Sequence, residues 1–277
     1  MKQAIATVLA GAMAIGCALP ALADQQQEAQ IGAQVYQQLS QKGEIIQSSP
    51  YYAVLNPIAA RIKRVADPQY YSPFHFILVH EAQPNAFAVP GGNVYVTDSM
   101  MTFVQNKEEL AGVLCHETSH DIHHDVVNNM QKDQNIGLAA TVLSILIGGG
   151  NNGIANTVLN LGANLETLRF SRTVEHNADQ KGAYTCAQAG LNPWGMVWLF
   201  DHFEAHPTAS PPEALSDHPR DDHRISDLEN LFHDNPATFG RFNSNIASAT
   251  PLNAVGFRTD ARHATLRQSS WKFGPRH

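Results

Sequence analysis

The chain has 277 residues, which is enough for one sizeable domain and short for two. It carries 18 basic and 25 acidic residues, a formal net charge of −7, and no block of basic residues, so nucleic acid is not an expected partner. Three cysteines are too few for a disulfide scaffold, so the fold has to depend on its core. Cys115 and Cys186 lie in apolar helical contexts, where buried free thiols are expected and a bridge between them is the alternative.

Residues 1–23 have the pattern of a cleavable export signal. One basic residue, Lys2, precedes an apolar run that ends in Ala21-Leu22-Ala23, a small-x-small cleavage sequence. The run is short for a bilayer span of about 20 residues, and a retained membrane anchor is one alternative. Lipid attachment at Cys17 is another, because Ala14-Ile15-Gly16-Cys17 loosely resembles a lipoprotein box. Each alternative exports the chain, and cleavage after Ala23 predicts a periplasmic protein.

Apolar periodicity and turn residues predict a mainly helical chain with a few strands. In chain order, the predicted elements are helices at 28–39 and 56–66, a strand at 74–80, two short strands within 85–100 around Pro90-Gly91-Gly92, a helix at 107–124, an apolar helical hairpin at 135–165, a long helix at 166–189, a proline-rich loop at 207–219 and a helix at 219–233. The hairpin is predicted to pack in the core, with a mobile cover over an active site or a membrane-dipping surface as alternatives. The pattern assigns no structure from residue 240 onward.

The helix at 107–124 carries His116-Glu117-Thr118-Ser119-His120, which has the form HExxH. Residues four apart lie on one face of a helix, so the two imidazoles can bind one ion. Glu117, beside the first histidine, is placed to act on a water at the open position of that ion. Zinc prefers such nitrogen and oxygen ligands in tetrahedral geometry. His123 and His124 are predicted to be solvated residues at the helix end.

A third ligand has to come from elsewhere, because the longer pattern HExxHxxGxxH is absent: residue 126 is Val126. The segment SRTVEHNADQKGA (171–183) places Glu175 and Asp179 one turn apart on the next long helix. Glu175 can complete the site, and Asp179 can orient a ligand imidazole through its other ring nitrogen. The alternative is an ordinary pair of exposed helix carboxylates.

HExxH followed by ExxxD resembles the zinc endopeptidases of family M48, which include HtpX-like proteases, CAAX prenyl endopeptidases and a periplasmic BepA-like branch. PNAFAVPGGNVYVT resembles the segment before the zinc helix of that family, SRTVEHNAD resembles its SRxxExxAD helix, and DHPRDDHRI fits its HPxxxxRI element. These matches cover roughly residues 50–230. The exported branch is the most similar, because no membrane span is predicted after the signal, although the helical-repeat tail of that branch has no counterpart in this sequence.

The resemblance implies an α+β fold: a mainly helical gluzincin-type metallopeptidase domain with a small antiparallel sheet next to the zinc helix. After the signal at 1–23, the sequence predicts a metallopeptidase domain at 24–239 and a C-terminal extension of unknown role at 240–277. One zinc ion would be bound by His116, His120 and Glu175, with Glu117 as general base.

Further roles carried by the resemblance are more specific. Asn85, Ala86 and Phe87 would form an edge strand that pairs with an extended substrate. His218 would lie near the metal and be catalytic, either stabilising the oxyanion or gating the open position; an ordinary loop histidine is the alternative. Arg224 would be structural and pair with a carboxylate such as Asp179.

The predicted function is hydrolysis of peptide bonds in unfolded or misfolded exported proteins, in quality control of the cell envelope. Peripheral contact with the outer membrane or its assembly machinery is an expected partnership. A zinc-stabilised periplasmic chaperone or assembly factor with little proteolysis is the alternative. A zinc hydrolase that does not act on peptides is a third, less favoured, because an edge strand suits an extended peptide.

Overall fold

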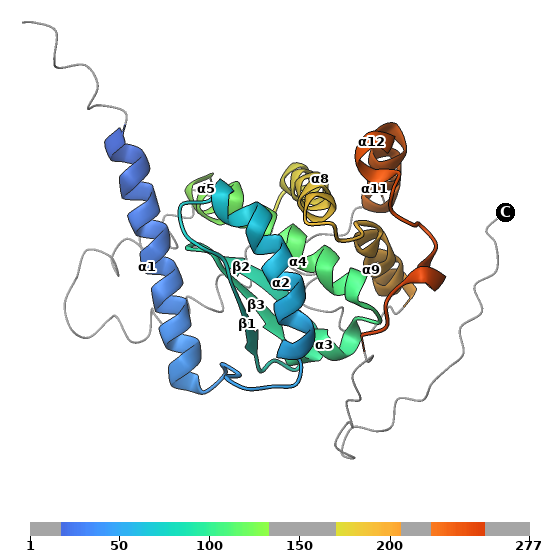
Figure 1. Ribbon diagram of the computed structural model, residues 1–277. Coiled ribbons are helices and arrows are strands. Elements are labelled where there is room, and N and C mark those ends of the chain that lie inside the picture. Colours follow the sequence, from blue (N-terminus) through green and yellow to red (C-terminus); the bar gives the residue numbers. More distant parts are fainter. Residues whose placement is uncertain (1–17, 133–169, 206–222, 253–277) are drawn as a thin grey trace, which may run out of the picture.

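The computed structural model describes residues 18–132, 170–205 and 223–252 (Figure 1). Its elements in chain order are α1 (Ala18–Lys42), α2 (Tyr52–Ala66), η1 (Asp67–Gln69), β1 (His75–Val79), β2 (Ala86–Val89), β3 (Asn93–Thr97), α3 (Asp98–Phe103), α4 (Lys107–Ile122), α5 (Asp125–Lys132), α8 (Arg172–Gln188), α9 (Trp194–Ala205), α11 (Arg224–Asp234), α12 (Pro236–Phe239) and η2 (Ile246–Ser248). The predicted hairpin at 135–165 and the loop at 207–219 lie outside the described residues. Within the described part, no helix is both long and apolar enough to cross a bilayer.

The mainly helical α+β fold is confirmed, and each helix and strand predicted between residues 28 and 124 has a counterpart. Helix α1 differs most from its prediction at 28–39, because it begins at Ala18, within the predicted export signal. Four α-helices of the described part, α3, α5, α9 and α12, were not predicted, and α9 is the longest of them. Asn192-Pro193 suggests only a helix end, yet the Asn192 side chain accepts a hydrogen bond from Trp194 N at 3.1 Å and Pro193 directly precedes the helix. A proline is well tolerated at a helix start, where its missing N–H is not needed.

The sheet has three strands in the order β1-β3-β2. β2 and β3 are antiparallel around the predicted turn, where Gly91 and Gly92 have φ of 103° and 92°, a conformation that favours glycine. β1, however, pairs in parallel with β3, so the sheet is mixed rather than antiparallel. The reason is the connection: residues 80–85 carry the chain to the far edge, and the hairpin then returns β3 to the centre in the direction of β1.

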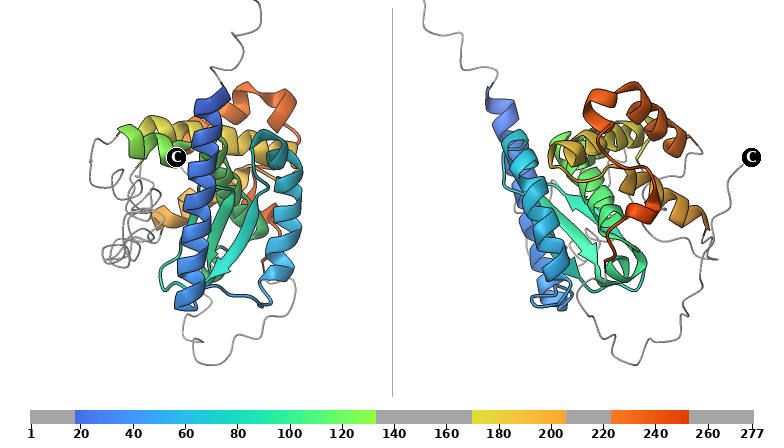
Figure 2. Two further views of the ribbon diagram at one scale, coloured as in Figure 1. Left: turned by 90° about the vertical axis from the view of Figure 1, so that its left-hand side faces the viewer. Right: turned by 45° about the vertical axis from the view of Figure 1, so that its right-hand side comes forward.

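Helix α4 lies at the centre of the fold and contacts β2, α2, α8 and α9. Every residue from Glu109 to Asp121 is buried, including the polar ones. Asn106 caps its start by accepting a hydrogen bond from Glu109 N at 2.8 Å. Helix α1 packs against one face of the sheet, and α2 packs with α4 against the other. The left view of Figure 2 shows the strands between α1 and α2.

A disulfide joins Cys115 on α4 to Cys186 on α8, with their Cα atoms 5.8 Å apart. The expectation of free thiols was therefore wrong, and the alternative, a disulfide between the two cysteines, is confirmed. The two helices approach closely because α8 has a glycine at the contact: a Cβ on Gly182 would lie 3.0 Å from the His116 backbone. This close packing brings together two cysteines that are 71 residues apart in the sequence.

The described start of the C-terminal segment, residues 240–252, returns to the beginning of α4. Asn106 forms a β-bridge with Pro251, and Leu252 is buried in the main core. The rest of the predicted extension lies outside the described residues.

Candidate metal centre

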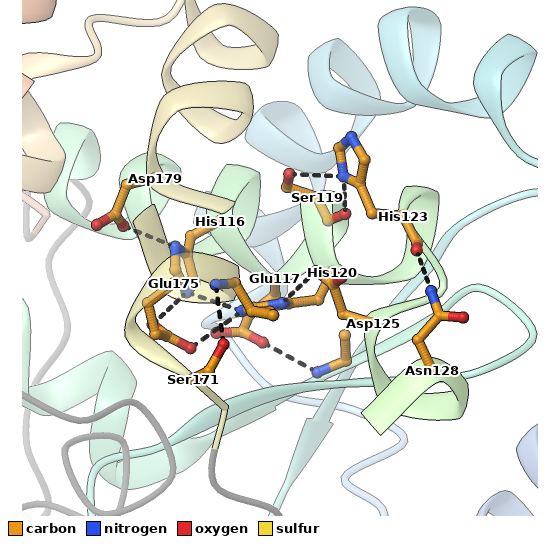
Figure 3. A network of polar contacts seen from close by, with 12 residues as sticks. His116, Glu117, Ser119, His120, His123, Asp125, Asn128, Ser171, Glu175 and Asp179 are labelled. Atoms are coloured by element: carbon orange, nitrogen blue, oxygen red, sulfur yellow. Dashed lines mark hydrogen bonds and ion pairs between the residues drawn. The ribbon is translucent and has the colours of Figure 1, made fainter. Parts of the chain in front are cut away.

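The three predicted ligands converge from two helices. His116 and His120 lie one turn apart on α4, and Glu175 lies in the first turn of α8 (Figure 3). The Nε2 atoms of the two histidines are 3.1 Å apart. Glu175 Oε2 lies 3.5 Å from His116 Nε2, and Glu175 Oε1 lies 3.6 Å from His120 Nε2. Over the described ranges, this is the one group of histidine, cysteine and carboxylate side chains found close enough to hold a metal ion.

These separations fit a zinc ion. Ligand atoms around a tetrahedral zinc, at bond lengths of about 2.0–2.1 Å, lie roughly 3.3 Å from one another. Both Nδ1 atoms face carboxylates, which leaves the Nε2 atoms as electron-pair donors. Two imidazole nitrogens and one carboxylate, all buried and turned toward one point, suit a divalent cation between them.

On the His116 side, the supporting groups form a buried ionic network. Asp179 Oδ1 lies 2.9 Å from His116 Nδ1. Arg224 donates two hydrogen bonds of 2.7 Å to Asp179, and its third nitrogen lies 3.1 Å from Glu175 Oε2. Burial alone would raise the pKa of Asp179, but Arg224 and His116 hold it below its ordinary value. Burial lowers the pKa of His116, but Asp179 and Glu175 outweigh it and raise that pKa to about 10, so the network favours positive charge here.

On the His120 side, the carboxylate comes from Asp125, a residue that was not predicted to belong to the site. Its Oδ2 lies 2.9 Å from His120 Nδ1. Helix α4 ends at Ile122, and His124 then takes a φ of 56°, a left-handed conformation uncommon in residues other than glycine. This turn starts α5 in a new direction and places Asp125 beside the imidazole. The only sequence signal was an acidic residue five positions after the second histidine, which has meaning only once the turn is known.

Glu117 connects the cluster to the sheet. Its side chain is buried, and its Oε2 accepts a hydrogen bond from Ala88 N at 3.1 Å. The carboxylate is therefore held between the HExxH helix and strand β2, on the helix that carries both imidazoles. A carboxylate in this place can accept a proton from a water at the metal position.

Strand β2 is an edge of the sheet, and its backbone direction alternates along the chain. Thr97 N donates to Asn85 O at 3.0 Å, so Asn85 and, two residues on, Phe87 turn their backbone groups toward β3. Ala86 and Ala88 turn theirs outward, as the bond from Ala88 N to Glu117 confirms. Of the predicted segment Asn85-Ala86-Phe87, only Ala86 thus presents its backbone at the edge.

Residues 53–232 match the sequence profile of Peptidase family M48. The chain belongs to this family of metallopeptidases. Its relatives include the "Beta-barrel assembly-enhancing protease" of Escherichia coli (strain K12), 27% identical over 254 residues that make up 83% of this chain and 52% of the relative. The protein of the same name from Yersinia pestis is 31% identical over 169 residues, 57% of this chain and 34% of the relative. The "Mitochondrial metalloendopeptidase OMA1" of Schizosaccharomyces pombe is 28% identical over 132 residues, 46% of this chain and 37% of the relative.

This M48 chain therefore spans about half or less of the length of these relatives. Of the predicted site residues, the structure brings together the metal cluster, Glu117, Asp179 and Arg224. His218 lies outside the described residues, and its role stays a prediction. His123 and His124 lie beyond the end of α4 and outside the cluster, and each has a polar partner: His123 Nδ1 is 2.7 Å from Ser119 O, and His124 Nδ1 is 2.6 Å from Glu28 Oε1.

Proposed function

We propose that this M48 peptidase is a zinc-dependent endopeptidase that cleaves unfolded or misfolded exported proteins. The observation that carries the proposal is the position of Glu117. It lies beside a buried cluster of three ligands and is hydrogen-bonded to β2, an edge strand of the three-stranded sheet, and such an edge suits an extended peptide. A protein that used zinc only for stability would not need a carboxylate in this place.

The reaction would be hydrolysis of a peptide bond. A bound zinc supplies Lewis acidity, which polarises a carbonyl and lowers the pKa of a water. Outward backbone groups of Ala86 would hold the substrate extended along β2, with the scissile carbonyl toward the cluster. Glu117 would take a proton from the attacking water while the water oxygen bonds to the carbonyl carbon. The same carboxylate would deliver that proton to the amine nitrogen as the C–N bond breaks.

Three features support the periplasm as the place of action. Residues 1–23 have the pattern of an export signal. The Cys115–Cys186 disulfide suits an oxidising compartment. Relatives are named for assembly of β-barrels, and we extend this to contact of the present chain with the outer membrane or its assembly machinery.

The experiment is the substitution Glu117→Gln, which removes the base and keeps all three ligands. We expect the variant to retain zinc, one ion per chain by elemental analysis, and to lose casein cleavage by at least about a hundredfold, the usual contribution of a general base. Glu229→Gln is the matched control, because Glu229 is an exposed carboxylate on α11 that is not part of the metal cluster. It should change neither zinc content nor cleavage.

Undiminished cleavage by Glu117→Gln would remove the assigned role. A wild type that binds zinc, cleaves no unfolded protein and suppresses client aggregation equally well with Glu117→Gln would instead support the chaperone alternative.

A further inference from the structure

A groove lies between α1 and α2, along the edge of the sheet that β1 forms. The left view of Figure 2 shows the strands between these two helices. Its volume is about 940 Å³, and strand β1 forms its floor through Phe76 and Ile77. The walls carry small residues, including Ala33 on α1 and Ala60 on α2. Such a groove is large enough for several amino-acid side chains and is walled mainly by apolar atoms.

The floor contains an unused piece of sheet edge. β1 pairs with β3 along one side, where His75 N donates to Gly92 O at 2.7 Å. On its other side, among the described residues, β1 makes one β-bridge, between Val79 and Ile45. In a parallel pair, alternate residues turn their backbone groups to the partner strand. His75, Ile77 and Val79 therefore face β3, and the residues between them face away from it.

At both ends of this outer edge of β1, the backbone N–H and C=O groups form hydrogen bonds with other residues of the chain. At one end, Phe74 N donates to Asp67 Oδ1 at 2.9 Å, and Phe74 O accepts from Lys63 Nζ. At the other end, Leu78 O accepts from Ile46 N at 2.9 Å, and Leu78 N donates to the Tyr52 hydroxyl at 3.1 Å. Between them, the outward N–H and C=O of Phe76 have no partner among the described residues. These unpaired backbone groups of Phe76 lie next to the stretch of β1 that pairs with residues 44–46.

Tyr36 is a second, independent observation at the same place. It lies on α1 in the wall of the groove, and it is 40% exposed. Among the large hydrophobic side chains of the described residues, it is the one that is exposed. Exposed tyrosines are enriched in binding surfaces, because the ring supplies contact area at a low cost in conformational entropy.

We propose that this groove is a second binding site for the unfolded polypeptide substrate, an inference that rests on the proposed function. An uncharged extended segment pairs with the backbone of Phe76 and packs its side chains against Tyr36 and the small residues of the walls. Backbone pairing requires an extended chain and is indifferent to sequence. Lys63 in the wall of the groove is paired with Asp67 at 3.4 Å and donates to Phe74 O, so its charge is offset within the chain and does not favour an acidic ligand.

The two substrate-binding edges belong to one sheet, β2 at the cluster and β1 in the groove. They lie two strand spacings apart, about 10 Å, but face opposite sides, so a substrate has to pass around the sheet to reach both. A peptide of about six residues spans roughly 20 Å and occupies one edge only. The groove therefore selects long unfolded chains over short peptides.

The test compares cleavage of casein with cleavage of a hexapeptide taken from one of its cleavage sites. Tyr36→Ala removes the exposed ring, and Ala60→Trp fills the groove from an exposed helix position. We expect each to raise the KM for casein by about fivefold or more, as for a central interface residue, with kcat unchanged. The hexapeptide should keep its kcat/KM. Ala53→Trp is the matched control, because Ala53 is exposed on the same helix and does not line the groove.

Zinc content and the thermal unfolding midpoint establish that each variant is folded, and Tyr36→Ala remains informative if Ala60→Trp is not. An unchanged KM for casein in the folded variants would overturn the proposal, as would an equal loss for casein and hexapeptide. If the wild type cleaves neither substrate, the proposed function fails. In that case, binding in the groove is tested by the affinity for casein of Glu117→Gln and of the double variant Glu117→Gln, Tyr36→Ala. Equal affinities of the two variants would overturn binding in the groove, and a fivefold weaker affinity of the double variant would support it.

Discussion

The two ligand histidines are supported in different ways. Behind His116, Asp179 is paired with Arg224, Arg224 stacks over Phe200 at 4.3 Å, and the preceding Cys115 is bonded to α8. Behind His120, the support is Asp125, at the start of the eight-residue helix α5, with a side chain that is 14% exposed. No disulfide or arginine among the described residues fixes Asp125 as Asp179 is fixed.

This difference separates two contributions to the site. The His116 support joins α4, α8 and α11, so it is part of the packing of the whole domain. The His120 support comes from a neighbouring residue of the same chain segment. Substitutions in the support of His116 should therefore lower the free energy of unfolding. Substitution of Asp125, the support of His120, should mainly lower metal affinity.

The largest expected effect is that of Arg224→Met, which keeps the length of the side chain and removes its charge. Asp179 and Glu175 would be left as buried carboxylates without their cation. Breaking a buried ion pair in this way costs about 3–5 kcal/mol. Urea unfolding of the metal-free protein measures it, and Arg64→Met, at an exposed position of α2, is the control. A loss below about 1 kcal/mol would show that the network is not part of the domain packing.

Removal of the disulfide by Cys115→Ala with Cys186→Ala should have a comparable effect on stability and a small effect on the metal. Closing a loop of 71 residues contributes about 4 kcal/mol in the chain-entropy model. Urea unfolding of this double variant and of the reduced wild type should show the same loss. If the folded double variant lost zinc, the disulfide would be holding the ligand geometry as well as the packing.

Asp125→Ala should have the opposite effect: a large loss of zinc affinity and a small loss of unfolding free energy. Loss of a carboxylate that orients a ligand imidazole typically lowers metal affinity by 10–100-fold. We expect this in zinc competition with a chelator, with a loss in unfolding free energy of less than about 1 kcal/mol for a partly exposed pair. Asp98→Ala is the control, because Asp98 Oδ2 makes the same contact with His80 Nδ1 at 2.8 Å outside the cluster. Equal zinc affinities of the two variants would contradict the positioning role.

The same contrast explains what the sequence could predict. His116, Glu117 and His120 are four residues or fewer apart on one helix, so helical geometry alone brings them together. Glu175, Asp179 and Arg224 required the family resemblance, because two further helices supply them. The structure then gave their contacts.

What the sequence could not predict depends on packing or on single backbone angles. The disulfide needed the register between α4 and α8, which the glycine contact at Gly182 sets. The parallel pairing of β1 with β3 needed the path of the chain across the sheet. Asp125 needed the left-handed turn at His124, which no periodicity reports.

The smallest expected effect is that of Glu28→Gln, which tests whether helix α1 stabilises the left-handed turn at His124. Glu28 on α1 is buried, lies 2.6 Å from His124 Nδ1 through Oε1, and accepts a hydrogen bond of 2.8 Å from the Tyr70 hydroxyl at Oε2. Burial and the nearby Asp121 raise the pKa of Tyr70, so its hydroxyl stays protonated and donates. Glu28→Gln keeps an acceptor and removes the charge, which weakens these bonds by roughly 1 kcal/mol.

If Glu28 holds the turn that presents Asp125, Glu28→Gln should lower zinc affinity by about two- to threefold. Tyr70→Phe is the matched comparison, because it removes the other hydrogen bond of Glu28 and leaves the contact with His124 in place. It should destabilise the packing of α1 and leave zinc affinity unchanged. Equal losses of zinc affinity in the two variants would mean that α1 acts on the site through its packing as a whole, and that the His120 support is less local than its geometry indicates.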